Sequence, residues 1–410
     1  VEKFKYTYYE DYVEDTYKKI DNKLIRGDLI SSGNYSIAMN QKGEGISKYK
    51  DIYINRFKMT DDYPQGIFFN IKNIKSKKII TSNNNDSISF MPDKIKQEII
   101  SENIKTTIET LIAPEEPVEI RSITLENQGN SEEILEVTSY FEPVLSNKTQ
   151  DYAHPAFNNL FLIYDFDEET NSIIIKRKKR EQNGQEIYLC ANLSTNCDTI
   201  GDLEYEIEKE KFFGRGNIGI AQMVKQSKPF SKKIGLVTEP IVALKRTIKI
   251  KPNQKEKINL IIAVGENKEE IKKEIQKYKI EENIKKAVEL SKAKNEAQNR
   301  YLRIKGTQIR DYQKMMSYIV FYNPTKKLNL ESLPKDKYKQ SELWKYGISG
   351  DLPIILVKIK DSNDAHVVKE VLKAYEFFRT KNLETELIIL DEEKHSYENY
   401  VRRCWKYNPK

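Results

Sequence analysis

The sequence has few places where aromatic, charged and amide side chains are grouped as a binding site requires. The clearest stretch begins with Tyr49, Lys50 and Asp51 and continues to Asn55 and Arg56. Sugars are held by aromatic faces together with planar groups that form paired hydrogen bonds, and these residues supply both. The stretch is therefore a candidate carbohydrate-binding surface, although an ordinary exposed strand explains the same pattern.

Three further stretches contain glycine or basic residues in positions that could meet a ligand. The sequence Phe213-Gly214-Arg215-Gly216-Asn217 fits a tight turn that presents Arg215, and a plain hairpin turn is the simpler alternative. The basic run at residues 176–180 could pair with phosphate, but its position between an apolar triplet and a polar turn is typical of a solvated strand end. The glycines at residues 347–351 precede an apolar run, whereas a phosphate-binding loop follows a strand, so no nucleotide site is expected.

The common catalytic signatures are missing from the sequence. It contains no P-loop, no GxSxG, no HExxH and no paired-cysteine zinc motif. The cysteines, Cys190, Cys197 and Cys404, are not spaced as metal ligands and fit free thiols in a reducing compartment. The formal net charge of +7 is spread along the chain, which argues against nucleic acid as a partner.

The elements that must position these residues are mostly strands. Residues 1–27 are polar and tyrosine-rich without clean periodicity, which predicts a linker that leads into the first domain. From 28 to 265 the pattern is that of a β domain, in which short apolar-polar alternations are separated by polar turns. One such alternation consists of Ile104, Thr106, Ile108, Thr110 and Ile112. Many strands with few helices predict a large antiparallel sandwich.

The composition changes after Gly265. Residues 266–322 are rich in Lys, Glu and Ala with apolar residues at helical spacing, which predicts a helical linker that stops at Asn323-Pro324. Residues 323–410 contain apolar runs at 353–359 and 387–390, and between them lies a helical pattern at 364–381. This order predicts a strand–helix–strand unit with parallel, buried strands.

Several of these stretches, taken in order, resemble glycoside hydrolase family 94, formerly glycosyltransferase family 36. They are Ser31-Ser32-Gly33-Asn34-Tyr35-Ser36, Gly43-Glu44-Gly45-Ile46-Ser47-Lys48-Tyr49-Lys50-Asp51, Asn55-Arg56-Phe57, His154-Pro155-Ala156-Phe157, the basic run at 176–180, Phe213-Gly214-Arg215-Gly216 and Leu343-Trp344-Lys345-Tyr346-Gly347-Ile348-Ser349-Gly350-Asp351-Leu352-Pro353-Ile354. The last stretch is similar to the β-1,2-glucan branch, which holds cyclic β-1,2-glucan synthases and β-1,2-oligoglucan phosphorylases. The family usually has Trp near positions 49 and 57, where this chain has Tyr49 and Phe57.

The resemblance implies a galactose-mutarotase-like super-β-sandwich, helical linkers and an α/β segment that leads into a catalytic (α/α)₆ barrel absent from this chain. It implies that the intact protein is a hexosyltransferase that acts on β-glucans, and that its barrel performs inverting phosphorolysis with inorganic phosphate as co-substrate and no other cofactor. No catalytic residue is then expected in this chain. The residues within the matched stretches that could bind substrate or a domain interface are Tyr49, Asp51, Arg56, Arg215, Trp344 and Asp351, and an interface is the preferred role for Trp344.

A non-catalytic carbohydrate-binding or dimerisation module is the alternative function, and a homodimer is a possible assembly. The sequence has no signal-peptide pattern and no apolar run near the ~20 residues of a membrane helix. We therefore expect a cytoplasmic location, with membrane association if the parent is a cyclic glucan synthase. The ends of the chain are consistent with a piece cut from something longer.

Overall fold

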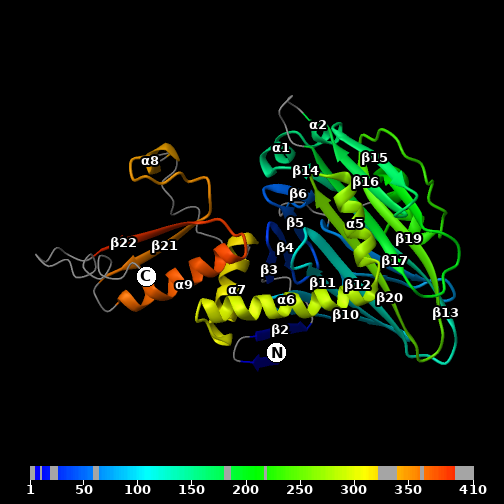
Figure 1. The fold of residues 1–410 in the computed structure, drawn as a ribbon, viewed down its shortest axis with the longest axis horizontal. Coiled ribbons are helices and arrows are strands. Elements are labelled where there is room, and N and C mark those ends of the chain that lie inside the picture. The colour runs from blue at the N-terminus through cyan, green and yellow to red at the C-terminus, as the bar shows by residue number, and fades with distance from the viewer. Residues whose placement is uncertain are drawn as a thin grey trace, which may run out of the picture.

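The computed structural model describes residues 5–9, 12–18, 26–58, 64–179, 186–216, 219–321, 339–360 and 364–392. Strands are more common than helices among these residues, and they form antiparallel sheets that pack on one another, with helices along one side and a small α/β unit beyond them (Figure 1). The chain is therefore mainly β and has the predicted super-β-sandwich fold. The described residues contain no (α/α)₆ barrel.

Three antiparallel sheets make up the described part of the sandwich. The large sheet has the spatial order β1 (Lys5–Tyr9), β2 (Tyr12–Lys18), β9 (Ser87–Phe90), β10 (Lys94–Ser101), β11 (Ile104–Ile112), β12 (Val118–Asn127), β20 (Lys255–Gly265), β17 (Ile187–Thr195), β16 (Ser172–Arg177), β15 (Leu162–Asp167). The second sheet has the order β18 (Glu204–Glu208), β19 (Pro240–Ile250), β13 (Glu133–Phe141), β7 (Phe68–Asn73), β8 (Ile79–Thr81). The third sheet has the order β14 (Pro143–Ser146), β6 (Ile52–Asn55), β5 (Gly45–Tyr49), β4 (Tyr35–Asn40), β3 (Gly27–Ser32).

Strand β11 shows how the sequence pattern produces the sandwich. The predicted alternating residues, Ile104, Thr106, Ile108, Thr110 and Ile112, are all buried, whereas most residues between them are half-buried. Successive side chains of a strand point to opposite faces, so the apolar set faces the interior. The prediction of one dry face is confirmed.

The main core lies between the large sheet and the other two sheets. Ile108 and Ile123 of the large sheet belong to the same buried cluster as Phe69 and Val137 of the second sheet. On its other face, the large sheet is covered by helix α5 (Lys268–Tyr278), and there Ile261 is buried together with residues of that helix. The central strands are thus buried on both faces, so their sequence does not show which side chains point toward which face.

The N-terminal segment differs from the predicted linker. Strands β1 and β2 form a hairpin, and β2 pairs with β9 to extend the edge of the large sheet. Val13 is fully buried, and Tyr17 packs edge-on against Phe90 with ring centroids 5.8 Å apart. Asp15, between them on the same face, is also buried and accepts a hydrogen bond from the Tyr17 hydroxyl. A carboxylate in the middle of the apolar face hides the alternation that would have predicted a strand.

The predicted helical region contains α5, α6 (Glu281–Tyr301) and α7 (Gly306–Val320). The Asn267 side chain caps α5 by accepting a hydrogen bond from the Glu269 amide at 2.9 Å. The predicted stop at Asn323-Pro324 lies outside the described residues. None of the described helices combines the length and apolar character needed to cross a membrane.

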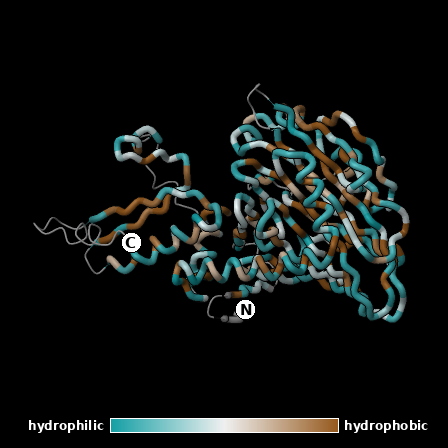
Figure 2. Tube along the Cα trace, viewed as in Figure 1, coloured by the Kyte–Doolittle hydropathy of each residue, from teal (hydrophilic) through white to brown (hydrophobic). Residues whose placement is uncertain are grey.

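The strand–helix–strand unit is confirmed. Strand β21 (Ile354–Ile359) pairs in parallel with β22 (Glu386–Asp391), and helix α9 (Ala365–Thr380) connects them and covers one face. The expectation that both strands are buried is wrong, because Ile354, Leu356 and Leu390 on the outer face remain exposed. Figure 2 shows this pair as an apolar ribbon that stands away from the sandwich.

The α/β unit is attached to the sandwich near the end of α9. Lys381 is buried, and its Nζ donates hydrogen bonds to the Pro92 carbonyl at 2.9 Å and to Asn295 Oδ1 on α6 at 2.6 Å. Nearby, the Ser31 hydroxyl donates to the Thr380 carbonyl at 2.9 Å. Two regions far apart in the sequence are therefore joined by buried polar contacts.

Helix α7 lies against the first strand of the third sheet. The Gly27 amide donates a hydrogen bond to Ser317 Oγ at 3.0 Å, and a Cβ added at Gly27 would lie 2.4 Å from the Phe321 ring. Glycine at this position permits the close approach of strand β3 to the helix.

Candidate functional site

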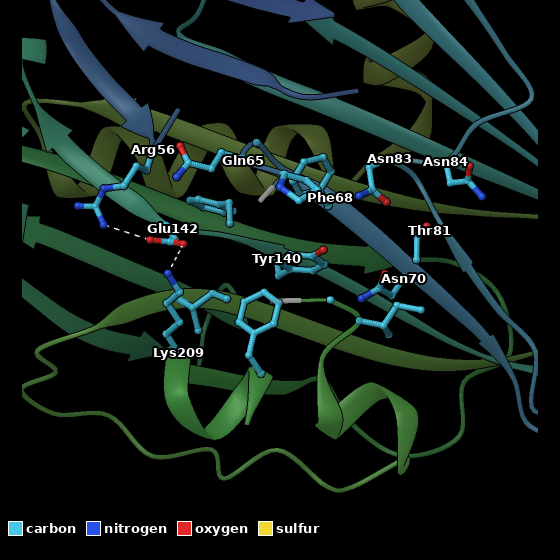
Figure 3. A pocket seen from close by; sticks show the side chains of 17 residues that line it. Arg56, Gln65, Phe68, Asn70, Thr81, Asn83, Asn84, Tyr140, Glu142 and Lys209 are labelled. Carbon is cyan, nitrogen blue, oxygen red and sulfur yellow. Dashed lines mark hydrogen bonds and ion pairs between the residues drawn. The ribbon is translucent and has the colours of Figure 1, made fainter. Parts of the chain in front are cut away.

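A cavity lies on the face of the second sheet that points away from the core. Its volume is about 380 Å³, and its walls come from β7, β8, β13 and β19 and from the short helix α3 (Lys209–Phe213) (Figure 3). Residues Phe69 and Ile71 of β7 point into the core, so the alternating residues Phe68 and Asn70 point into the cavity.

Aromatic rings form one wall of this cavity. The Tyr140 ring lies 5.8 Å from Phe68 and 5.6 Å from Phe213, measured between ring centroids. Burial raises the pKa of the Tyr140 hydroxyl well above its usual value, and the adjacent Asn70 amide only partly offsets this effect. The hydroxyl is therefore neutral at physiological pH and able to donate a hydrogen bond.

Asn70 lies beside Tyr140 and has unused hydrogen-bonding capacity. Its side chain is 1% exposed, and neither the amide oxygen nor the amide nitrogen has a hydrogen-bond partner of good geometry. Leaving buried polar atoms without partners costs about 1–3 kcal/mol, so such atoms are normally paired or serve a ligand. Gln65, Asn83 and Asn84 add further planar amides to the same cavity (Figure 3).

The other end of the cavity is charged and internally paired. Glu142 accepts hydrogen bonds from Arg56 Nη1 at 3.1 Å and forms an ion pair with Lys209 Nζ at 2.6 Å. Arg56 also binds Asp151 through Nε at 3.1 Å and Nη2 at 2.8 Å, and its Nη2 reaches Asn159. Burial alone would lower the pKa of Arg56, but the bonds with Asp151 and Glu142 outweigh it and raise the pKa. Arg56 is thus a buried clamp that ties β6 to α1 (Lys148–Ala153) and α2 (Pro155–Asn159).

This charge arrangement limits the chemistry of the cavity. Glu142 is the one carboxylate among the described residues that line it. Hydrolysis or phosphorolysis of a glycosidic bond needs an acid that can give up a proton, and inverting hydrolysis needs a second carboxylate at a fixed distance. Glu142 is held by two cations, and among the described lining residues it has no carboxylate partner, an arrangement that suits binding.

A second hollow of about 450 Å³ adjoins the first and shares Lys209 and Phe213 with it. Arg215 lies here, exposed, on a turn in which Gly214 and Gly216 have φ values of +84° and +68°. The glycines thus form the tight turn that the sequence indicated, and the arginine is presented to solvent at the rim.

The remaining predicted residues lie elsewhere. Tyr49 is half-buried against the core with Lys50 above its ring, and Asp51 is exposed at a cleft between the sandwich and the α/β unit. Asp351 accepts a hydrogen bond from Gln340 at 2.9 Å. Trp344, in helix α8 (Ser341–Trp344), is 63% exposed and donates to the Ser349 carbonyl at 3.3 Å. The structure therefore does not bury the Trp344 ring between described domains, and the six predicted residues do not form one site.

Sequence reasoning missed the residues that form the cavity itself. Phe68, Asn70 and Tyr140 lie in strands whose two faces are both largely covered, so no alternation distinguishes the ligand face from the core face. Phe213 was part of a predicted turn, but only its arginine neighbour was singled out. The basic run at 176–180 is a strand end where it is described, because Lys176 pairs with Glu186 at 2.9 Å and Arg177 stacks on Phe161.

Comparison with known proteins agrees with the resemblance seen in the sequence. The chain is 24% identical over 386 residues to the cyclic beta-(1,2)-glucan synthase NdvB of Rhizobium meliloti (strain 1021), and the match covers 90% of this chain and 13% of that protein. Among solved structures, a putative kojibiose phosphorylase from the human microbiome is 12% identical with a TM-score of 0.41 over 78% of this chain and 42% of that chain. A putative aldose 1-epimerase from Escherichia coli K12 is 8% identical with a TM-score of 0.30 over 59% of this chain and 100% of that chain.

The family assignment rests on the sandwich. The model of the glycosyl hydrolase 94 supersandwich domain matches residues 10–281, which begin in the N-terminal segment and end at the start of α6. This range contains the three antiparallel sheets apart from strand β1, together with the cavity and the clamp formed by Arg56. The chain belongs to the glycosyl hydrolase 94 family.

Proposed function

We propose that this chain is a carbohydrate-recognition region of a protein that makes or breaks β-glucans, and that it binds glucan in the cavity on the second sheet. The observation that carries the proposal is the Asn70 amide, which is buried beside Tyr140, has no hydrogen-bond partner of good geometry and is directed into a cavity with an aromatic wall. A sugar ring offers a face for the aromatic wall and hydroxyls for the amide.

The finer details of the proposal come from the relative. The β-1,2 linkage is taken from the named product of the glucan synthase, of which this chain matches 13% of the length. Inverting phosphorolysis would then be done by a barrel outside this chain, with phosphate attacking the anomeric carbon while a carboxylic acid protonates the glycosidic oxygen. The clamped Glu142 supports a non-catalytic role for the region itself.

Titration calorimetry with β-1,2-linked glucose oligosaccharides tests the proposal. We expect Asn70→Ala to weaken binding about tenfold, which corresponds to the ~1–1.5 kcal/mol of a lost hydrogen bond. Its melting temperature should change little, because the amide makes no internal hydrogen bond of good geometry. Asn130→Ala is the matched control, since Asn130 is exposed on the turn between β12 and β13.

Two outcomes would contradict the proposal. Equal affinities for Asn70→Ala and the wild-type chain would remove the cavity as the glucan site. Release of glucose 1-phosphate from β-1,2-glucan and inorganic phosphate by the purified chain would refute its non-catalytic role.

A further inference from the structure

A second cleft lies where the sandwich meets the α/β unit. Its volume is about 560 Å³, and its walls come from the third sheet on one side and from the end of α9 and the loop after it on the other. The residues that matter are Asn34, Lys48 and Asp51 on the sandwich wall and Tyr375, Glu384 and Thr385 on the opposite wall. Small-molecule sites often lie at such junctions, and their volumes are about 300–1,000 Å³.

The two walls are held in fixed positions. Asn382 Nδ2 donates to the Gly33 carbonyl at 2.8 Å, and the Ser31 hydroxyl donates to the Thr380 carbonyl at 2.9 Å. The buried Lys381 lies between these two contacts in the sequence. A ligand that enters the cleft therefore meets preformed walls and does not have to order them, which favours binding.

The polar groups that line the cleft are largely uncommitted. The Thr385 side chain is 5% exposed, and its hydroxyl has no hydrogen-bond partner. Within the described part of the chain, the side chains of Lys48, Asp51 and Glu384 have neither a hydrogen bond nor an ion pair. By contrast, the other cations at the cleft are already paired, Lys50 with Glu266 at 2.8 Å and Arg379 with Glu376 at 3.2 Å.

These groups identify the class of ligand. Two carboxylates accept hydrogen bonds, the lysine donates them, and a hydroxyl and an amide can do both, while Tyr375 offers an aromatic ring. Asp51 and Glu384 would repel an anion, and the described residues contain no group of three or more side chains able to hold a metal ion. A neutral molecule with many hydroxyls matches this combination.

We propose that the cleft is a second carbohydrate site, which binds a short glucan segment between the sandwich and the α/β unit. Its residues are separate from those of the cavity on the second sheet, so the two sites can be tested independently. A sugar bound here touches both walls and stabilises the docked arrangement of the two parts, because a ligand that binds only the docked state shifts the equilibrium toward it.

The experiment is titration calorimetry of the full chain with a β-1,2-linked glucose tetrasaccharide. We expect two binding events for the wild-type chain, of which Thr385→Val weakens one about tenfold and Asn70→Ala weakens the other about tenfold. Thr385→Val keeps the side-chain shape and removes a hydroxyl that makes no hydrogen bond, so its melting temperature without sugar should not fall. Asp51→Asn provides a second cleft variant on the exposed wall, and Asn130→Ala should keep both sites.

Each other outcome has a definite meaning. Binding of one sugar that Asn70→Ala weakens and Thr385→Val leaves unchanged would overturn the cleft and support the proposed function. Binding of one sugar that Thr385→Val and Asp51→Asn weaken, with Asn70→Ala unaffected, would support the cleft and overturn the cavity as the site of the proposed function. Absence of any binding would overturn both.

Discussion

Replacing Lys381 with methionine should separate the α/β unit from the sandwich. The Lys381 ammonium group lies among the Pro92 carbonyl, Asn295 on α6 and the buried Asp28 of β3. Burial lowers the pKa of Lys381 and raises the pKa of Asp28, and the attraction between the two charges offsets part of each shift. Methionine keeps the length of the apolar stem but removes the charge and both hydrogen bonds.

The size of the effect follows from these contacts. Losing the lysine leaves the Pro92 carbonyl and Asn295 Oδ1 without their donor, at about 1–3 kcal/mol for each unsatisfied group. It also removes the positive charge that attracts the buried Asp28 carboxyl. These contributions overlap, so we expect the free energy of unfolding to fall by about 3–5 kcal/mol.

Urea denaturation measures the loss, and hydrogen exchange followed by mass spectrometry localises it. Exchange should increase in α9 and β22 more than in the large sheet. Lys373→Met is the matched control, because Lys373 lies on the same helix but forms only a half-exposed pair with Glu370 at 3.2 Å, worth less than about 1 kcal/mol.

A double mutant tests the electrostatic part of the reasoning. Asp28→Asn removes the carboxylate that Lys381→Met leaves unpaired, so the double mutant should be less destabilised than the sum of the two single mutants. The reasoning is refuted if Lys381→Met costs no more than Lys373→Met, or if the effects of Lys381→Met and Asp28→Asn simply add.

Two further predictions follow from the described contacts. Trp344→Ala should change the free energy of unfolding by less than about 1 kcal/mol, because the ring is 63% exposed. Phe377→Ala removes a fully buried ring and should cost about 3–5 kcal/mol. Equal losses of stability for the two variants in urea denaturation would contradict the assignment of Trp344 to the surface. Burial, with Glu116 nearby, raises the pKa of Glu274 to about 7, so the folded state binds more protons than the unfolded state between about pH 4.5 and 7, and stability falls as the pH rises through this window. Glu274→Gln should remove this pH dependence and stabilise the chain at pH 8 by about 1 kcal/mol after allowance for solvent screening. If the free energy of unfolding of the variant and of the wild-type chain changes with pH in parallel, Glu274 is not the group responsible.

The fold could be predicted where one physical signal dominated. The alternation from Ile104 to Ile112 identified a strand because its alternate residues form one uniform face. The segment 353–359 identified a strand because it is one uniform apolar run. The N-terminal hairpin was missed because Asp15 interrupts its apolar face. Strands β21 and β22 were predicted to be buried because they are apolar. The prediction is wrong for their outer face, because apolar composition alone does not show what covers a strand.

The site could be predicted less well than the fold, for a geometric reason. Arg56 was found because it lies in a stretch that groups aromatic, charged and amide residues, but its role in the structure is a clamp on Asp151. Asn70 and Tyr140 meet only through the pairing of β7 with β13, in which Thr138 lies opposite Asn70 and Phe68 lies opposite Tyr140. Strands whose two faces are both covered give no sign in the sequence of which face holds the cavity.

The pairing of β12 with β20 has a consequence for how the chain acquires its structure during synthesis. Glu126 pairs with Lys255, so β12 must wait for about 130 further residues before its neighbour exists. At roughly 5–20 residues per second, the ribosome needs about 6–26 s to supply them. During that interval one edge of the β9–β12 meander is unpaired, and such non-local pairing also folds slowly. The nascent chain therefore exposes an unpaired strand edge during synthesis, and slowing elongation between residues 127 and 255 should lower the yield of folded protein.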